Sequence, residues 1–238
     1  MQFLGIDLGW TGKPSGLALL DLEGERLKLC HLSRPASHAE LLAAIDRLLA
    51  PDVPVWIGLD APVLITNESG SRAADRMAHS LFSREHAGAY PVHLGLPFAA
   101  PVLALVAALL ARQFSTTLPE AARLETRQVF EVFPHAAALR LFSLPRILPY
   151  KKGPLAERLK ALEAFHHLLS TGLAKRRPAL RPRHLPAAGN TLAALKSCED
   201  QLDALLCAYI AAHFWFWGLA RTNILGDART GFIVNPSF

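Results

Sequence analysis

The sequence predicts an α/β fold built on a mixed sheet of five strands. Three short apolar segments near the N-terminus, Gln2 to Leu8, Gly16 to Leu22 and Arg26 to Leu32, have the composition and turn spacing of an antiparallel meander. Two further apolar runs, Val55 to Leu59 and Gln128 to Phe133, follow after helical or loop segments. Strands that alternate in this way with helices are typical of α/β proteins.

Several helices are predicted between and after these strands. Hydrophobic residues recur at helical spacing from His38 to Leu49, with Ser37 as the N-cap and Glu40 as its capping-box partner. An apolar helix around Val102 to Ala111 and a long helix from Glu199 to Leu219 follow, and the tail after them contains a short predicted strand, Phe232–Val234. We interpret residues 1–238 as one domain that carries insertions at about 63–125 and 145–186, the second of them helical.

The composition is that of a globular protein with a large core. Hydrophobic residues make up 51% of the chain and charged residues 19%, which argues against disorder. Neither apolar helix is expected to cross a membrane. The first is shorter than the ~20 residues that a bilayer requires, and the second begins beside an acidic cluster. Three cysteines at no metal-binding spacing, and the lack of a recognisable signal peptide, predict a cytoplasmic location.

Positive charge is concentrated in one part of the chain. The formal net charge is +5, and between Arg140 and Arg183 only Glu157 and Glu163 oppose a series of lysines and arginines. Such a field attracts nucleic acid or other phosphates. It is equally typical of a solvated surface that keeps a hydrophobic protein soluble.

Acidic residues end two of the predicted strands and mark one helix. Asp7 lies at the end of the first strand in Gly-Ile-Asp-Leu-Gly, and Asp60 follows the fourth. Asp200 and Asp203 are three residues apart and therefore share one face of the long helix, whereas Glu199 is expected to be exposed. Buried carboxylates require a partner, and a metal ion would serve. The alternative is that Asp7 and Asp60 only cap turns.

This set of carboxylates indicates a site for Mg²⁺ or Mn²⁺, because hard cations prefer oxygen ligands. The site would hold one or two ions. Two ions ~4 Å apart can activate a water molecule and stabilise the leaving oxygen during phosphodiester cleavage.

The order of strands and acids resembles the RNase H-like superfamily, particularly its RuvC-type resolvases. More closely, the chain resembles an uncharacterised family of predicted RNase H-like nucleases. The resemblance rests on Gly5-Ile-Asp-Leu-Gly9, Leu59-Asp-Ala-Pro62, Arg72-Ala-Ala-Asp-Arg76, Glu131-Val-Phe-Pro134, Tyr150-Lys-Lys152, Asp200-Gln-Leu-Asp203 and Gly226-Asp-Ala-Arg-Thr-Gly231.

The resemblance implies helices on both faces of the sheet and a set of metal ligands. Asp7, Asp60 and Asp203 would be ligands, with Asp200 a ligand or a close neighbour. Glu131 would join them as a fifth catalytic carboxylate, or it would instead pair with an arginine, Arg127 or Arg140.

Four basic residues are candidates for binding substrate: Arg72, Arg76, Lys151 and Lys152. Arginine can bind a phosphate through two hydrogen bonds at once. The alternatives are a local ion pair between Arg72 and Asp75 and a solvated loop at the two lysines. His135 is either a catalytic group or a structural histidine.

Three functions are compatible with these features. The first is a metal-dependent nuclease acting on nucleic acid. The second is an ATP-using phosphotransferase, because Gly5 to Gly9 also resembles the first phosphate-binding hairpin of the actin and sugar-kinase superfamily. The third is a non-catalytic module that binds nucleic acid or nucleotides. The aromatic segment Phe214 to Trp217 is expected to pack in the core, or, if exposed, to form a homodimer surface.

Overall fold

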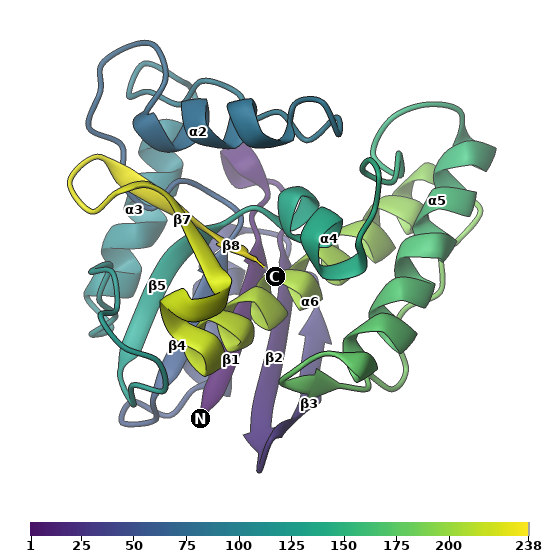
Figure 1. The fold of residues 1–238 in the computed structure, drawn as a ribbon, viewed down its shortest axis with the longest axis horizontal. Helices are drawn as coiled ribbons and strands as arrows, with labels where there is room; N and C mark the ends of the chain where they lie inside the picture. The colour runs from purple at the N-terminus through teal and green to yellow at the C-terminus, as the bar shows by residue number, and fades with distance from the viewer. Residues whose placement is uncertain (238) are drawn as a thin grey trace.

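Eight strands form one mixed sheet in residues 1–237, which the computed structural model describes (Figure 1). The strands are β1 (Gln2–Asp7), β2 (Gly16–Glu23), β3 (Arg26–Ser33), β4 (Val55–Leu59), β5 (Arg127–Val132), β6 (Ala179–Leu180), β7 (Thr222–Asp227) and β8 (Gly231–Pro236). Their order across the sheet is β6-β3-β2-β1-β4-β5-β8-β7.

The central strands pair in a way that brings two strand ends together. Strands β1, β2 and β3 form the predicted antiparallel meander. Strand β4 is parallel to β1, and β5 is parallel to β4. The ends of β1 and β4 therefore meet at the same edge of the sheet, with Ile6 beside Leu59. This pairing makes Asp7 and Asp60 neighbours.

The predicted number of five strands is wrong, because the described part of the chain adds three strands at the two edges. The hairpin of β7 and β8 joins the sheet beside β5, and the two-residue strand β6 pairs with β3. The sequence indicated a short strand at Phe232–Val234 but not the partner strand that precedes it. A strand as short as Ala179–Leu180 carries no alternation of apolar and polar residues that could predict it.

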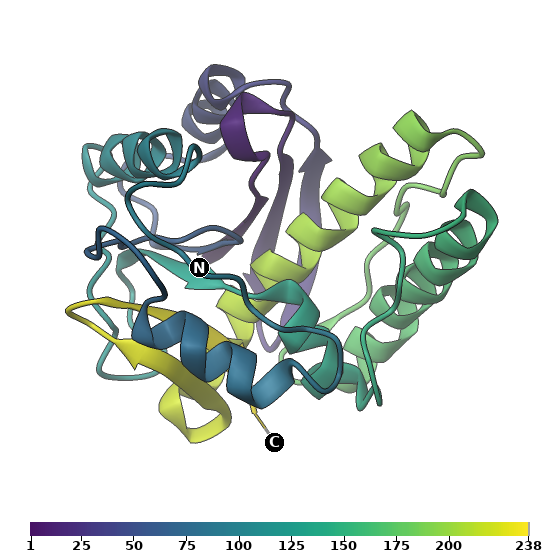
Figure 2. The same ribbon diagram turned by 90° about the horizontal axis from the view of Figure 1, so that it is seen from above.

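Helices cover both faces of the sheet (Figure 2). The described residues form α1 (His38–Leu48), α2 (Ala73–Phe82), α3 (Ala99–Leu110), α4 (Pro134–Phe142), α5 (Leu155–His167) and α6 (Leu192–Trp217). Helices α1 and α3 share one core with the sheet, and α4, α5 and α6 share the other. At the start of α1, the Ser37 hydroxyl accepts a hydrogen bond from the Glu40 backbone, as the capping pattern predicted.

Helix α6 lies unusually close to the sheet. A Cβ on Gly5 would come within 1.9 Å of the Ala204 carbonyl oxygen, and one on Gly16 within 1.9 Å of the Asp200 carbonyl oxygen. Glycine at both positions is what permits this approach. The close packing holds Asp200 and Asp203 against the strands that carry the other carboxylates.

Helix α6 is the buried centre of the fold. It is long and apolar enough to cross a membrane by length and composition, but 89% of its most apolar window is buried inside the structure, as in a core helix. Phe214, Trp215 and Phe216 are buried, which confirms the prediction that they pack in the core. The helix begins at Leu192 rather than near Glu199, because the Thr191 hydroxyl caps its first turn.

Candidate functional site

Three aspartates meet at the edge of the sheet where β1 and β4 end. Asp7 is the last residue of β1, and Asp60 directly follows β4, where its backbone N–H donates to the Ile6 carbonyl oxygen at 2.8 Å. Asp203 reaches them from α6 and is fully buried. We call Asp7, Asp60 and Asp203 the carboxylate cluster.

Two neighbouring residues in the loop before α5 hold the carboxylate cluster. The Lys151 ammonium lies 2.9 Å from Asp203 Oδ2, and its side chain is 30% exposed. The Tyr150 hydroxyl donates to Asp203 Oδ1 at 2.7 Å. Asp203 is therefore fixed by a cation on one oxygen and a hydroxyl on the other.

The pKa values of the cluster show that negative charge is in excess. Burial raises the pKa of Asp7 well above its usual range, although Lys151 opposes the shift. Burial also raises the pKa of Asp60 to about 7, against the effects of Lys151 and of a hydrogen bond from Asp7. At Asp203, Lys151 and Tyr150 outweigh burial, and the pKa is lowered. One ammonium, that of Lys151, thus faces three carboxyl groups, two of which have raised pKa values.

The chemistry of these donors fits a hard divalent cation. If all three carboxylates are ionised, they carry two negative charges more than Lys151 neutralises. A divalent ion would supply the missing charge, and oxygen ligands suit Mg²⁺ or Mn²⁺. Within residues 1–237, no group of three or more acidic, histidine or cysteine side chains has a ready-made metal-binding arrangement. Because the Lys151 ammonium already contacts Asp203 Oδ2, a metal ion that binds there would have to displace it.

Asp200 does not join the carboxylate cluster, although the sequence suggested it as a metal ligand. Its Oδ2 lies 2.7 Å from Arg34 Nε, and its Oδ1 lies 2.7 Å from Lys196 Nζ. With a cation on each oxygen, Asp200 is neutralised without a metal. The prediction that Glu199 is exposed is wrong, because Glu199 is 1% exposed and its Oε1 lies 2.6 Å from Lys196 Nζ.

Glu131 forms an ion pair with an arginine and does not belong to the carboxylate cluster. Two nitrogens of Arg72 donate to its two oxygens at 2.7 and 2.8 Å, and Arg72 also donates to Asp75 Oδ1 at 2.7 Å. Its partner is thus Arg72, whereas the sequence suggested Arg127 or Arg140. Glu131 lies beside Leu59 in the sheet, and its charge contributes to the raised pKa of Asp60.

Arg72 is enclosed by carboxylates, which favours the alternative of a local ion pair with Asp75 over the predicted role in substrate binding. It is 3% exposed, and its remaining contact is a hydrogen bond to the Leu64 carbonyl oxygen at 3.0 Å. A guanidinium enclosed in this way has no surface for a substrate. Arg76 and Lys152, by contrast, are exposed, so a substrate can reach both.

His135 lies at the side of the carboxylate cluster. Its ring centroid is 5.5 Å from that of Tyr150, and burial lowers its pKa to about 4. Its Nε2 atom is buried and has no hydrogen-bond partner among the described residues. His135 is therefore neutral at ordinary pH.

The loop after Asp7 is compact and carries an exposed aromatic side chain. The Gly9 N–H donates to the Ser15 hydroxyl at 3.0 Å, and the turn η1 (Trp10–Gly12) lies between them. Trp10 packs on Phe98 with ring centroids 4.1 Å apart and remains 42% exposed.

Sequence reasoning missed three polar partners of the site: Tyr150, Arg34 and Lys196. The i,i+4 spacing of Lys196 and Asp200 was a signal that could have revealed their ion pair. Tyr150 was named only as part of the segment Tyr150-Lys-Lys152, on which the family resemblance partly rests. No local signal connects Arg34 with Asp200, because 166 residues separate them.

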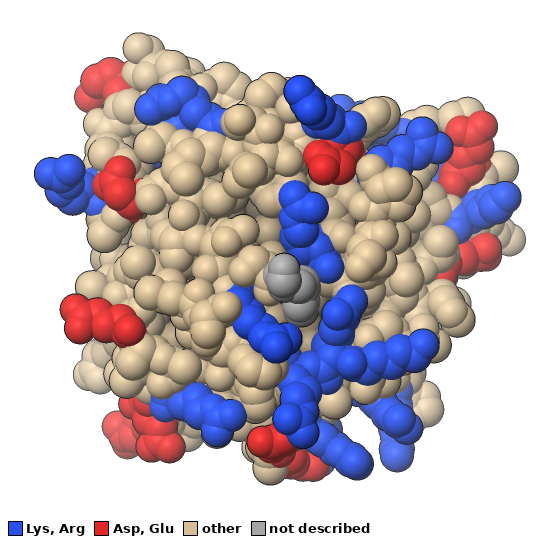
Figure 3. All heavy atoms as spheres, in the orientation of Figure 1, with Lys and Arg blue, Asp and Glu red and all other residues tan. Residues whose placement is uncertain are grey.

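Lysine and arginine side chains gather on one face of the molecule. Figure 3 shows them from the centre of the view to its lower right, with few acidic side chains between them. Two arginines rest on aromatic rings at the end of α6: Arg123 lies 4.4 Å from the Phe216 centroid and Arg221 lies 4.2 Å from that of Trp217. Part of the positive charge thus covers apolar surface.

The fold and the site define an α/β protein with a buried carboxylate cluster at the ends of two parallel strands. A family model described as "Protein of unknown function (DUF429)" matches residues 5–224, so the chain belongs to this family. The matched range includes the whole carboxylate cluster with Lys151 and Tyr150. Comparisons with curated proteins and with solved structures found no match.

Proposed function

We propose that the protein is a divalent-metal-dependent nuclease that hydrolyses phosphodiester bonds in nucleic acid. The observation that carries this proposal is the convergence of Asp7, Asp60 and Asp203 on a single compensating ammonium, that of Lys151. Burying this many carboxylates is unfavourable without further positive charge.

The topology supports assigning an RNase H-like fold. The central order β3-β2-β1-β4-β5, with an antiparallel meander followed by two parallel strands, is the arrangement that the sequence resemblance implies. The carboxylates also lie at the implied positions, at the ends of the first and fourth strands and on a late helix. The strands β6, β7 and β8 extend this core at its edges.

The carboxylate cluster and its two partners, Tyr150 and Lys151, have different tasks in this proposal. Asp7, Asp60 and Asp203 would hold one or two Mg²⁺ or Mn²⁺ ions. The bound metal would activate a water molecule and polarise the phosphoryl oxygens. Tyr150 keeps one oxygen of Asp203 in place. Lys151, once displaced from the carboxylates, would be free to contact a substrate phosphate.

Asp7→Asn should reduce Mn²⁺-dependent cleavage of a labelled oligonucleotide at least about 100-fold. Replacing even a residue that only hydrogen-bonds to a metal ligand lowers metal affinity or activity about 10–100-fold. The amide keeps the shape of the carboxyl group, so the circular dichroism spectrum should not change. Asp52→Asn, at an exposed loop position, is the matched control and should cleave at the wild-type rate. Equal cleavage by Asp7→Asn and the wild type would refute the proposed function.

The affinity for Mn²⁺ should rise as the pH is raised towards 7. Asp60, with a pKa of about 7, holds or shares a proton below that pH, and the incoming cation must displace it. For each proton displaced, the apparent dissociation constant should fall about tenfold per pH unit. Calorimetry in buffers of different ionisation enthalpy measures both the affinity and the protons released. An affinity that does not change with pH would contradict a site at Asp60.

A further inference from the structure

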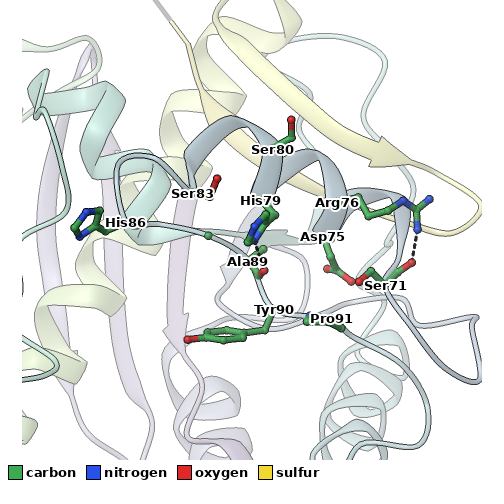
Figure 4. A pocket seen from close by; sticks show the side chains of 11 residues that line it. Ser71, Asp75, Arg76, His79, Ser80, Ser83, His86, Ala89, Tyr90 and Pro91 are labelled. Carbon is green, nitrogen blue, oxygen red and sulfur yellow. Dashed lines mark hydrogen bonds between the residues drawn. The ribbon is translucent and has the colours of Figure 1, made fainter.

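A groove of about 780 Å³, with several polar residues in its lining, lies between α2 and the segment that follows it (Figure 4). The exposed face of α2 contributes Arg76, His79 and Ser80, and Ser83 lies at the end of the helix. Tyr90 forms the opposite side and is 74% exposed. In Figure 4, the His79 side chain points from the helix towards the segment that carries Ala89 and Tyr90.

The groove offers hydrogen-bond donors and positive charge without a competing anion. Asp75 is the one acidic residue among those that line it. Its oxygens are occupied by the Arg72 guanidinium, by the Arg72 backbone N–H at 2.9 Å and by the Val92 backbone N–H at 3.0 Å. Arg76 donates to the Ser71 carbonyl oxygen and has no ion-pair partner within residues 1–237. A negatively charged ligand suits this lining.

The groove is tied to the carboxylate cluster through side chains. Asp75 is bound to Arg72, Arg72 is bound to Glu131, and Glu131 lies on β5 beside the end of β4 that leads to Asp60. Helix α2 packs against the hairpin of β7 and β8, which joins the sheet beside β5. The groove and the carboxylate cluster are therefore linked through α2 and β5.

We propose that this groove binds the sugar-phosphate backbone of a single-stranded nucleic acid, with Arg76 contacting a phosphate and Tyr90 stacking on an unpaired base. The inference rests on the proposed function, since it names the substrate strand of the same site. A polynucleotide suits the lining because hydroxyls and a guanidinium bind phosphate oxygens. An exposed aromatic ring stacks on any base that is free of a duplex.

The test measures binding of a fluorescent single-stranded oligonucleotide by anisotropy, with EDTA present so that no cleavage occurs. Arg76→Ala should weaken binding about tenfold and reduce the steepness of its salt dependence by about 0.7, the contribution of one phosphate contact on a single strand. Arg84→Ala removes an exposed arginine just after the end of α2, outside the groove lining, and should bind like the wild type.

Tyr90→Ala tests the second contact. It should weaken binding of the single strand about tenfold and leave binding of the matching duplex unchanged, because stacking requires an unpaired base. Equal losses for single strand and duplex would overturn the assignment of Tyr90. If inorganic phosphate competes with the oligonucleotide as well as an unlabelled strand does, the groove is a small-anion site and the strand proposal is wrong.

The outcomes separate this inference from the proposed function. Cleavage by the wild type, together with equal binding by Arg76→Ala and Arg84→Ala, would reject the groove alone. Binding that depends on Arg76, without cleavage under any divalent metal, would support the groove and reject the nuclease.

Discussion

Replacing Lys151 with methionine should destabilise the metal-free protein by about 3 kcal/mol at neutral pH, the lower end of the range for breaking a buried ion pair. The lower end applies because Lys151 is 30% exposed, whereas its partner Asp203 is fully buried. Without the ammonium, Asp203 keeps the Tyr150 hydroxyl but loses its cation. Asp7 and Asp60 lose the charge that opposes their burial.

The loss of stability on replacing Lys151 should depend on pH in a defined direction. In the Lys151→Met variant, burial would raise the pKa of all three aspartates above the unfolded value of about 4. Carboxyls with raised pKa values favour folding below the unfolded pKa, and that contribution is lost as the pH rises through the folded pKa. The difference between variant and wild type should therefore grow from about pH 4 to pH 7.

Urea unfolding at several pH values, with and without Mn²⁺, measures these effects. Lys152→Met is the matched control, since Lys152 is exposed and its replacement should change stability by less than about 0.5 kcal/mol. Millimolar Mn²⁺ should restore most of the stability of Lys151→Met, because a cation bound to the carboxylate cluster replaces the missing charge. A loss that Mn²⁺ does not reverse would count against a metal site at this position.

Replacing Arg72 with methionine should cost about 3–5 kcal/mol of folding free energy, the largest effect that we expect from a single substitution. Arg72 is buried between Glu131 and Asp75, and its removal leaves both carboxylates without their cation. Asp75 keeps two backbone N–H donors, so the loss of the Arg72 cation would destabilise Glu131 more than Asp75.

A double-mutant cycle tests this explanation. Glu131→Gln in the Arg72→Met background should recover a large part of the lost stability, because it removes the uncompensated charge. Arg76→Met, one turn along α2 and exposed, should be nearly neutral. If the double variant were as unstable as the sum of the two single variants, packing and not charge would explain the loss.

The sequence predicted the carboxylates because they interrupt apolar runs. A charged residue at the end of a buried strand, as at Asp7 and Asp60, is conspicuous, and so is an acidic pair on the apolar face of α6. The antiparallel meander also followed from local patterns. These features depend on residues close together in the chain.

The partners of the carboxylates could not be predicted in the same way. Arg34 pairs with Asp200 across 166 residues, and Arg72 with Glu131 across 59. Both pairs result from packing between distant segments, for which the sequence carries no periodic signal. The edge strands β6 and β7 were not predicted for a related reason. Strand β6 has only two residues, and apolar and polar residues alternate only weakly in β7.

Trp10 gives the protein a built-in optical probe three residues from Asp7. Of the four tryptophans, Trp56 and Trp215 are buried and Trp217 is partly covered by Arg221. Because Trp10 is 42% exposed, aqueous quenchers should act mainly on its emission. Its position beside Phe98 makes that emission sensitive to any movement of the loop after β1. Occupation of the neighbouring carboxylates could thus be followed by unlabelled fluorescence in real time.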